Sequence, residues 1–362
     1  MNKILFFLTL FAFKAHAIEL KVGALIGNNK PGISKTQYTE KFYEAILLAK
    51  IAYEKELKKK NITLTFKIYE MKDDPINNYF PIKKAISDKM DVLIGPSSSF
   101  YIPGIHLALK DSKTKLLVIS PYSMSKLIRD SKNMVSMLDM NNDFNGMLNH
   151  FVNMKFQDKS FLTICAEDVE ASKVHCGGLS QKFKNKKNYI ATNKDISNID
   201  QIVAQVLKDK PDFVITPNRI PISGVIIREL TKKGFRGTFI GSSALGEIKE
   251  TGLLSVVGHD DFKAIALRQN SVHDLNYDSK YASTVKALTE AWGYPRLTSL
   301  LFYDAMAMVI EAILEGQNKF RQTIRKNNSY SGIISKKKKK RKIYKAIQIE
   351  KGIYSLLGRF SI

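Results

Sequence analysis

Two apolar stretches that each end in hydroxyl residues limit the possible folds most strongly. The first is Asp91–Ser99, in which Val-Leu-Ile leads into Gly-Pro and three serines, and the second is Leu116–Ser123. Between them, Gly104–Lys110 has its apolar residues at helical spacing. The pattern predicts a strand, a serine loop, a helix, a second strand and a second serine loop. In an open parallel sheet, ligands bind beyond the carboxyl ends of such strands.

The serines of the first loop have two interpretations. Ser97, Ser98 and Ser99 are of a residue type that caps helices and forms turns, which would be a purely structural role. Hydroxyl groups, together with free N–H groups at the start of a helix, also suit a carboxylate or another small anion. The residues alone leave both interpretations open.

The same alternation of strands and helices continues along all 362 residues, a length that favours two domains. The expected strands are Leu20–Ile26, Ile62–Tyr69, Asp91–Ile94, Lys115–Ile119, Phe161–Cys165, Tyr189–Ala191, Asp212–Thr216, Phe239–Gly241 and Phe262–Leu267. The expected helices lie around Phe42–Tyr53, Ile82–Ile86, Ile199–Leu207, Pro221–Gly234, Lys280–Trp292 and Thr298–Leu314, with one more ending near Phe183. The rhythm predicts an α/β protein with two doubly wound parallel sheets, the last two helices returning to the first half.

The amino terminus has the pattern of a cleavable signal peptide. Lys3 precedes the apolar run Ile4–Phe13, and Ala15-His-Ala17 is a small-x-small cleavage site. The run is too short to span a membrane, and no later segment is apolar for eighteen residues. We therefore expect residues 1–17 to be removed near Ala17, and an exported, periplasmic protein that does not span the membrane.

The chain is strongly basic, with 57 Lys and Arg against 34 Asp and Glu and a formal charge of +23. Such an excess fits either a solvated surface or a site for a polyanion. Runs such as Lys55–Lys60 fall on polar helix faces, and no nucleic-acid-binding motif accompanies them. We expect no nucleic-acid partner. The run Lys336–Lys342, in a tail of expected strands from Tyr330 onward, is predicted to form an exposed hairpin turn or, alternatively, a basic patch.

Cys165 and Cys176 are the chain's only cysteines. In an oxidising compartment they would bridge a strand end to the following helix, if geometry permits, or else be two small buried residues. Enzyme motifs are absent: the sequence has no Gly-x-Ser-x-Gly, no His-Glu-x-x-His and no Walker loop. Asp73-Asp74 precedes Pro75 and is typical of a turn. No cofactor and no metal site is expected.

Taken together, the pieces resemble the type I periplasmic solute-binding proteins of the branched-chain amino acid (Leu/Ile/Val) class, which serve ABC importers. The matching pieces, in order, are Val22–Ala24, Asp74-Pro75, Leu93–Ser99, Val118–Pro121, Pro211–Val214, Leu230–Phe235, Phe239–Gly241, Ala291–Pro295, Tyr303–Ala305, Ser329–Gly332 and Tyr344–Ile349. Each piece is weak alone, but their order and spacing cover nearly all of the chain that follows the signal peptide.

The resemblance implies two Rossmann-like lobes with parallel sheets, joined by a hinge of three crossings, with a small-molecule ligand in the cleft between them. The first lobe would be residues 18–137 plus 270–332, and the second 138–269 plus 333–362. Family members open and close about the crossings, and the closed form docks on the membrane permease of the transporter. Ligand binding would stabilise the closed state because the ligand touches both lobes.

The resemblance also implies binding residues on the first lobe. In the family, serine-loop hydroxyls hold the carboxylate of an amino acid. Here the matching serine is Ser98, with Ser97 and Ser99 as one-residue alternatives, and the second loop supplies Tyr122, Ser123 and Ser125.

The opposite wall departs from the family pattern. Ser243 stands where the family has a glutamate for the ammonium group, and Arg219 where it has an aromatic residue. Arg219 would either face the cleft and favour an anionic ligand or point to solvent. Asp168 and Glu170 would either replace the missing carboxylate or be solvated loop acids.

The expected function is therefore capture of an amino acid or a related carboxylate for an ABC importer, without enzymatic activity. Two alternatives on the same fold are a sensory or accessory ligand-binding protein and a scaffold that has lost its ligand.

Overall fold

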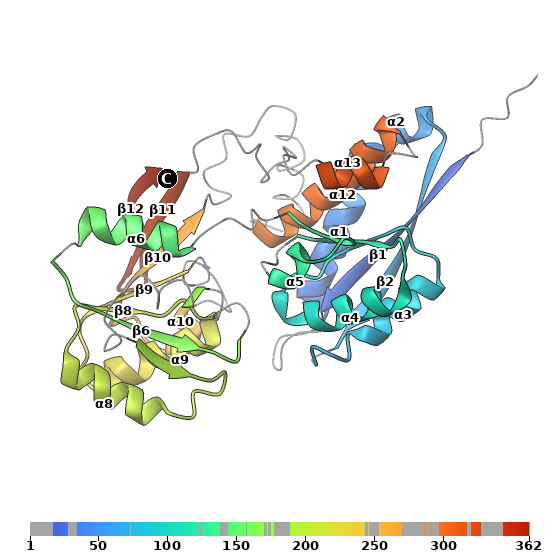
Figure 1. The fold of residues 1–362 in the computed structure, drawn as a ribbon. Helices are drawn as coiled ribbons and strands as arrows, with labels where there is room; N and C mark the ends of the chain where they lie inside the picture. Colours follow the sequence, from blue (N-terminus) through green and yellow to red (C-terminus); the bar gives the residue numbers. More distant parts are fainter. Residues whose placement is uncertain are drawn as a thin grey trace, which may run out of the picture.

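The computed structural model shows two α/β lobes side by side (Figure 1). It describes residues 17–27, 35–72, 74–121, 123, 125–137, 144–156, 158–169, 172, 175–176, 189–242, 245, 253–269, 286, 290, 297–316, 320–326 and 343–361. Within these residues the strands form one five-stranded and one seven-stranded sheet. The predicted α/β class is confirmed.

The first lobe is built on a parallel sheet with strand order β2-β1-β3-β4-β5. Its strands are β1 (Ile18–Gly27), β2 (Ile62–Met71), β3 (Val92–Ile94), β4 (Leu117–Ser120) and β5 (Met134–Ser136). β3 and β4 are fully buried, as their unbroken apolar sequence predicts for strands covered on both faces. β5 was not predicted from the sequence.

Helices cover both faces of the first sheet. They are α1 (Lys35–Ala52), α2 (Glu54–Lys59), α3 (Tyr79–Ser87), α4 (Ile102–Ser112), α5 (Lys126–Arg129), α12 (Leu297–Glu315) and α13 (Phe320–Lys326), with a 3-10 turn at Ser99–Tyr101. One core joins α1, α12 and α13 to the sheet, where Phe42 stacks on Phe302 at 4.6 Å between ring centroids. A second core lies under α3 and α4. The late helix α12 therefore belongs to the first lobe, as the chain order suggested.

The second lobe has strand order β12-β11-β10-β9-β8-β6-β7. Its strands are β6 (Phe161–Ala166), β7 (Tyr189–Thr192), β8 (Phe213–Ile215), β9 (Thr238–Gly241), β10 (Lys263–Gln269), β11 (Ile343–Glu350) and β12 (Ile353–Ser361). Strands β6 to β10 are parallel. β11 and β12 are antiparallel to their neighbours, so this sheet extends beyond the expected strand at Phe262–Leu267 and is only mostly parallel. For the pair β11 and β12 the reason is that a short hairpin turn can join only antiparallel strands.

Helices and a disulfide complete the second lobe. The helices are α6 (Phe144–Lys155), α8 (Ile199–Asp209), α9 (Ile220–Lys232) and α10 (Leu253–Val257). α8, α9 and α10 pack on one face of the sheet and α6 on the other. Cys165 at the end of β6 forms a disulfide with Cys176, which decides between the two interpretations of the cysteines.

The described elements alternate between the lobes three times along the chain. β5 is followed by α6, β10 by α12, and α13 by β11, and each of these pairs has one member in each lobe. The predicted boundaries at 137/138 and 269/270 fall where described segments end, and 332/333 lies outside the described residues. The exact boundaries therefore stay predictions.

Several other predictions also lie outside the described residues: the signal peptide up to residue 16, most of the helix Lys280–Trp292, and the hairpin expected at Lys336–Lys342. The hairpin that the structure describes joins β11 to β12 and turns at Lys351-Gly352. Among the described helices, none combines the length and the apolar character needed to cross a membrane.

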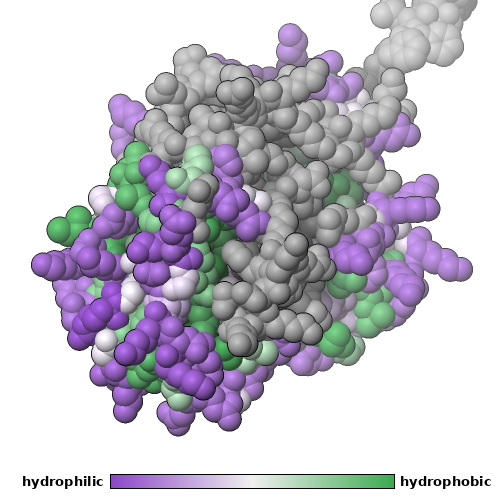
Figure 2. Space-filling view, turned by 60° about the vertical axis from the view of Figure 1, so that its left-hand side comes forward, coloured by the Kyte–Doolittle hydropathy of each residue, from purple (hydrophilic) through white to green (hydrophobic). Residues whose placement is uncertain are grey.

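The surface visible in Figure 2 is mainly hydrophilic where residues are described, with small hydrophobic areas between hydrophilic ones. Some of the surface lysines are paired: Lys58 lies 2.8 Å from Glu54, and Lys67 lies 2.7 Å from Asp88. Exposed pairs of this kind contribute little to stability.

Candidate functional site

The first serine loop begins at Gly95, directly after the buried strand β3. Gly95 has φ of +119°, which side chains other than hydrogen rarely allow. A Cβ at this position would also overlap the backbone carbonyl and the Cβ of Leu25 in β1. Glycine is therefore required here for the chain to leave β3 and present Ser97–Ser99 beyond the sheet.

Ser98 has the capping role that the structural interpretation assigned to it. Its Oγ accepts a hydrogen bond from the backbone N–H of Phe100 at 3.2 Å and caps the 3-10 turn Ser99–Tyr101. Ser99 is buried, and its Oγ lies 2.9 Å from the Oγ of Ser123. The two serine loops, which are 24 residues apart in sequence, are thus joined by a direct contact between hydroxyl groups.

The second serine loop is tied to the first at further points. Ser120 Oγ donates to the carbonyl of Pro96 at 3.0 Å, and the backbone N–H of Ser125 donates to Ser123 Oγ at 3.4 Å. Ser125 is only 1% exposed, and its Oγ has no hydrogen-bond partner within the described part of the chain. A buried hydroxyl without a partner is unfavourable unless something else supplies one.

The second lobe contributes Arg219, which lies between β8 and α9. Its Nη2 donates a hydrogen bond to Ser98 Oγ at 2.5 Å, although the two residues are 121 positions apart. The alternative that Arg219 points to solvent is therefore wrong. This contact places a positively charged group of one lobe directly on the serine loop of the other.

Asn218, the neighbour of Arg219, fixes the chain at this point. Its Oδ1 accepts from the backbone N–H of Ala166 at 3.0 Å, and its Nδ2 donates to the carbonyl of Ile164 at 2.8 Å. Nδ2 also lies 3.0 Å from Thr216 Oγ1. Asn218 is 1% exposed, so these bonds are shielded from water. They hold the segment after β8 against β6 and thereby fix the backbone position from which the Arg219 side chain extends. Asn218 was not predicted as a site residue from the sequence.

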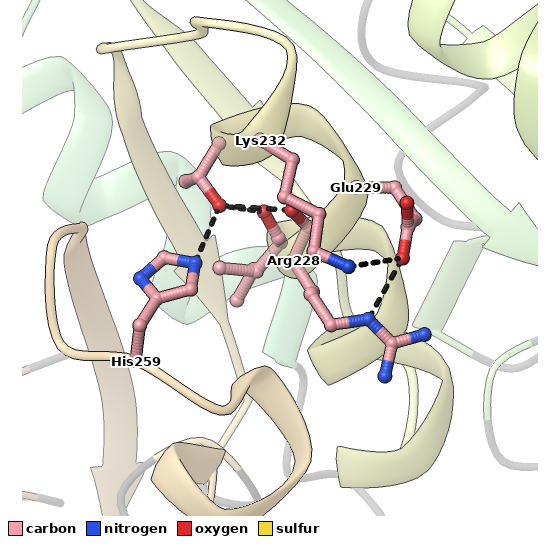
Figure 3. A network of polar contacts seen from close by, with 6 residues as sticks. Arg228, Glu229, Lys232 and His259 are labelled. Carbon is pink, nitrogen blue, oxygen red and sulfur yellow. Dashed lines mark hydrogen bonds and ion pairs between the residues drawn. The ribbon is translucent and has the colours of Figure 1, made fainter.

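The far end of α9 is held as well. Thr231 Oγ1 lies 2.9 Å from His259 Nε2, and one turn earlier Arg228 Nε donates to Glu229 at 2.7 Å (Figure 3). Lys232 approaches the same carboxylate at 3.7 Å. These cationic groups therefore have an acidic partner, whereas Arg219, at the start of the same helix, forms no ion pair with any described residue.

Burial controls the electrostatics of Arg219. Loss of solvent lowers the pKa of its guanidinium, and the nearby Tyr101 acts in the opposite direction. Arginine is nevertheless protonated in proteins, because its ordinary pKa is so high. The site therefore holds a partly desolvated positive charge beside the hydroxyl groups of two serine loops.

The topology explains why these residues meet. In the first sheet, the chain goes from β1 to β2 on one side and to β3 on the other; in the second, it goes from β6 to β7 on one side and to β8 on the other. Such switch points create the crevice in which open α/β sheets bind ligands. Ser98 follows β3 and Arg219 follows β8, so their hydrogen bond joins the switch point of one sheet to that of the other.

The remaining predicted site residues are placed less centrally. Ser97 is half-buried in the first serine loop, and Asp168 is exposed beyond the end of β6. Tyr122, Glu170 and Ser243 lie outside the described residues. Their participation stays a prediction.

Comparison of the sequence with protein-family models and with curated proteins finds no match. Solved structures do match. The branched-chain amino acid transporter substrate-binding protein LivJ from Streptococcus pneumoniae, in complex with isoleucine, aligns with a TM-score of 0.75 at 12% identity, over 95% of this chain and 99% of that one.

Two further structures agree with this result. The leucine-binding protein LivK from Thermotoga maritima aligns with a TM-score of 0.74 at 15% identity, over 94% of this chain and 98% of that one. A solute-binding protein of an ABC transporter from R. palustris, in complex with benzoate, aligns with a TM-score of 0.69 at 17% identity, over 95% and 97%. The chain therefore has the fold of the type I periplasmic binding proteins, over almost its whole length.

Proposed function

We propose that this protein is an exported solute-binding protein, which captures an amino acid or a related small carboxylate between its lobes and delivers it to the permease of an ABC importer. The observation that carries the proposal is the contact of Ser98 with Arg219, which brings the switch points of the two sheets together. The fold of the isoleucine-bound and benzoate-bound binding proteins supports the same function.

The proposed mechanism is binding coupled to lobe closure. Hydroxyl groups of Ser97, Ser98, Ser99, Ser123 and Ser125 would face the ligand from the first lobe. Arg219 would face it from the second lobe, with Tyr122, Asp168 and Ser243 as further candidates. A ligand that contacts both lobes binds the closed arrangement more tightly than the open one and so shifts the population toward it. We assign no catalytic role to any of these residues.

Export is supported by the signal-like amino terminus and by the disulfide of Cys165 with Cys176, since disulfides persist in oxidising compartments. The permease is proposed from the fold of the similar proteins, which serve ABC transporters. A permease of this kind would bind the closed arrangement of the two lobes in preference to the open one.

A thermal-shift screen tests the proposal directly. The protein is unfolded, dialysed free of ligand and refolded, and then heated with a panel of leucine, isoleucine, benzoate and isocaproate (leucine without its ammonium group). The neutral amides of the two acids are included. A ligand at one hundred times its Kd stabilises the folded state by about 2.7 kcal/mol, which raises the melting temperature by several degrees. No shift with any member would contradict capture of a small carboxylate of this kind.

The ligand-less scaffold is a second candidate, and one observation favours it. Arg219 finds a hydrogen-bond acceptor on the opposite lobe in Ser98, so side chains of the protein itself make a contact between the lobes. A scaffold of this kind would show no thermal shift with the panel, whereas a binding protein would.

A further inference from the structure

The interlobe contact leaves an excess of hydrogen-bond donors. Ser98 Oγ accepts from both Phe100 N–H and Arg219, so its own O–H is directed elsewhere and meets no acceptor among the described residues. Arg219 has five N–H donors, and its contact with Ser98 uses one nitrogen. Ser125 adds a buried hydroxyl that has no partner within the same described set. Donors without acceptors around a partly buried positive charge are satisfied best by an anion.

We propose that Arg219 selects the charge of the ligand by gripping its carboxylate from the second lobe while the Ser98 hydroxyl donates to the same group from the first. The preferred ligand is then a net anion, a small monocarboxylate, and not a zwitterionic amino acid. This inference rests on the proposed function, which it narrows to a class of ligand.

The charge balance of the site gives the reason for the preference. A carboxylate neutralises Arg219, which no described acid does, and accepts the free Ser98 proton. An amino acid would bring an ammonium group close to the same guanidinium, and a like charge in a desolvated site is unfavourable. Because the grip involves both lobes, the same interaction also favours closure over the open arrangement.

Isothermal titration of the ligand-free protein tests this inference with matched probes. Isocaproate and leucine differ by the ammonium group, and benzoate and benzamide differ by the charge. In Arg219→Met the methionine keeps apolar bulk and removes the guanidinium, and Arg219→Lys keeps the charge but loses the planar fork. Arg228→Met is the control, since it removes an arginine from the same helix α9 at a site paired with Glu229. Circular dichroism melts establish that each variant is folded.

We expect wild type to bind isocaproate or benzoate more tightly than leucine or benzamide. Arg219→Met should weaken carboxylate binding roughly 10- to 100-fold, the range of a hydrogen-bonded charge pair. Arg219→Lys should bind carboxylates with an affinity between those of wild type and Arg219→Met. Arg228→Met should bind them like wild type. If a folded Arg219→Met binds carboxylates as well as wild type, or if leucine outcompetes isocaproate, the inference is overturned while the proposed function stands. If wild type binds no member of the panel, both are overturned.

Discussion

Replacement of Asn218 by alanine tests whether this residue supports the site structurally, without contacting the ligand itself. The side chain is 1% exposed and bridges the ends of β6 and β8 through the N–H of Ala166 and the carbonyl of Ile164. Asn218→Ala leaves both backbone groups buried without a partner, at a cost of about 1–3 kcal/mol for each. Partial relaxation of the loop should recover some of this loss. We therefore expect the free energy of unfolding to fall by roughly 2–4 kcal/mol.

The assay is urea unfolding followed by circular dichroism, with titration of benzoate or isocaproate on the folded variant. Asn198→Ala is the matched control, because Asn198 also bonds a strand carbonyl, that of Ala191 at 2.9 Å, but this contact is exposed. Its other partner is the Thr192 hydroxyl, which can rotate toward another acceptor when Asn198 is removed. Water can replace a partner there, so the free energy of unfolding of the control should fall by less than about 1 kcal/mol. Asn218→Ala should also bind the carboxylate more weakly, because Arg219 is no longer held in place.

Two results would refute this reasoning. Equal losses of stability in Asn218→Ala and Asn198→Ala would mean that the buried hydrogen bonds of Asn218 contribute no more than exposed ones. Wild-type carboxylate affinity in a destabilised Asn218→Ala would mean that Asn218 holds β6 and β8 together without positioning Arg219.

Two further predictions concern the second lobe. The disulfide closes a loop with a sequence separation of 11, so replacing both Cys165 and Cys176 by alanine should lower the free energy of unfolding by about 3 kcal/mol. Urea unfolding with and without reductant measures this, and the double variant should not respond to the reductant. Hydrogen bonds from the Ser160 backbone and hydroxyl hold the pKa of Asp212 below its usual 3.8. A lowered carboxyl pKa stabilises the fold above the unfolded pKa and loses that effect as the pH falls through the folded one. Melting temperatures from about pH 2 to 6 should therefore drop less steeply toward acid in Asp212→Asn than in wild type. If both proteins lose melting temperature equally as the pH falls, the lowered pKa of Asp212 does not contribute to stability.

Strands and helices were predictable where burial imposes a simple pattern. β3 and β4 are unbroken apolar runs that end in Gly95 and Ser120, and α9 has regular helical spacing between Pro221 and Gly234. β5 has only three residues, which is too few for a periodicity to show. The exact ends of elements depend on tertiary contacts that the local sequence does not contain.

The terminal hairpin was missed for a physical reason. Its turn residues, Lys351 and Gly352, have φ of 50° and 72°, and turns with two positive φ values normally carry Asn-Gly or Asp-Gly. A lysine at the first position gives almost no signal. The run Lys336–Lys342 was the more conspicuous polar break, so the turn was predicted there.

The candidate site was predictable on one wall only. Ser98 stands out because three serines follow a buried strand, but its simultaneous roles as cap and as acceptor for Arg219 require the folded chain. The contact of Arg219 depends on the placement of the first lobe, which carries Ser98, and Asn218 acts through backbone groups more than fifty positions away. No local pattern encodes contacts of that range.

A crystal structure of the wild-type protein with benzoate or isocaproate, whichever binds more tightly, tests the central claim most directly. The carboxylate is predicted to lie between the lobes, within hydrogen-bond distance of both the Arg219 guanidinium and the Ser98 hydroxyl. A carboxylate bound elsewhere, with Arg219 still donating to Ser98 and to no ligand atom, would contradict the account.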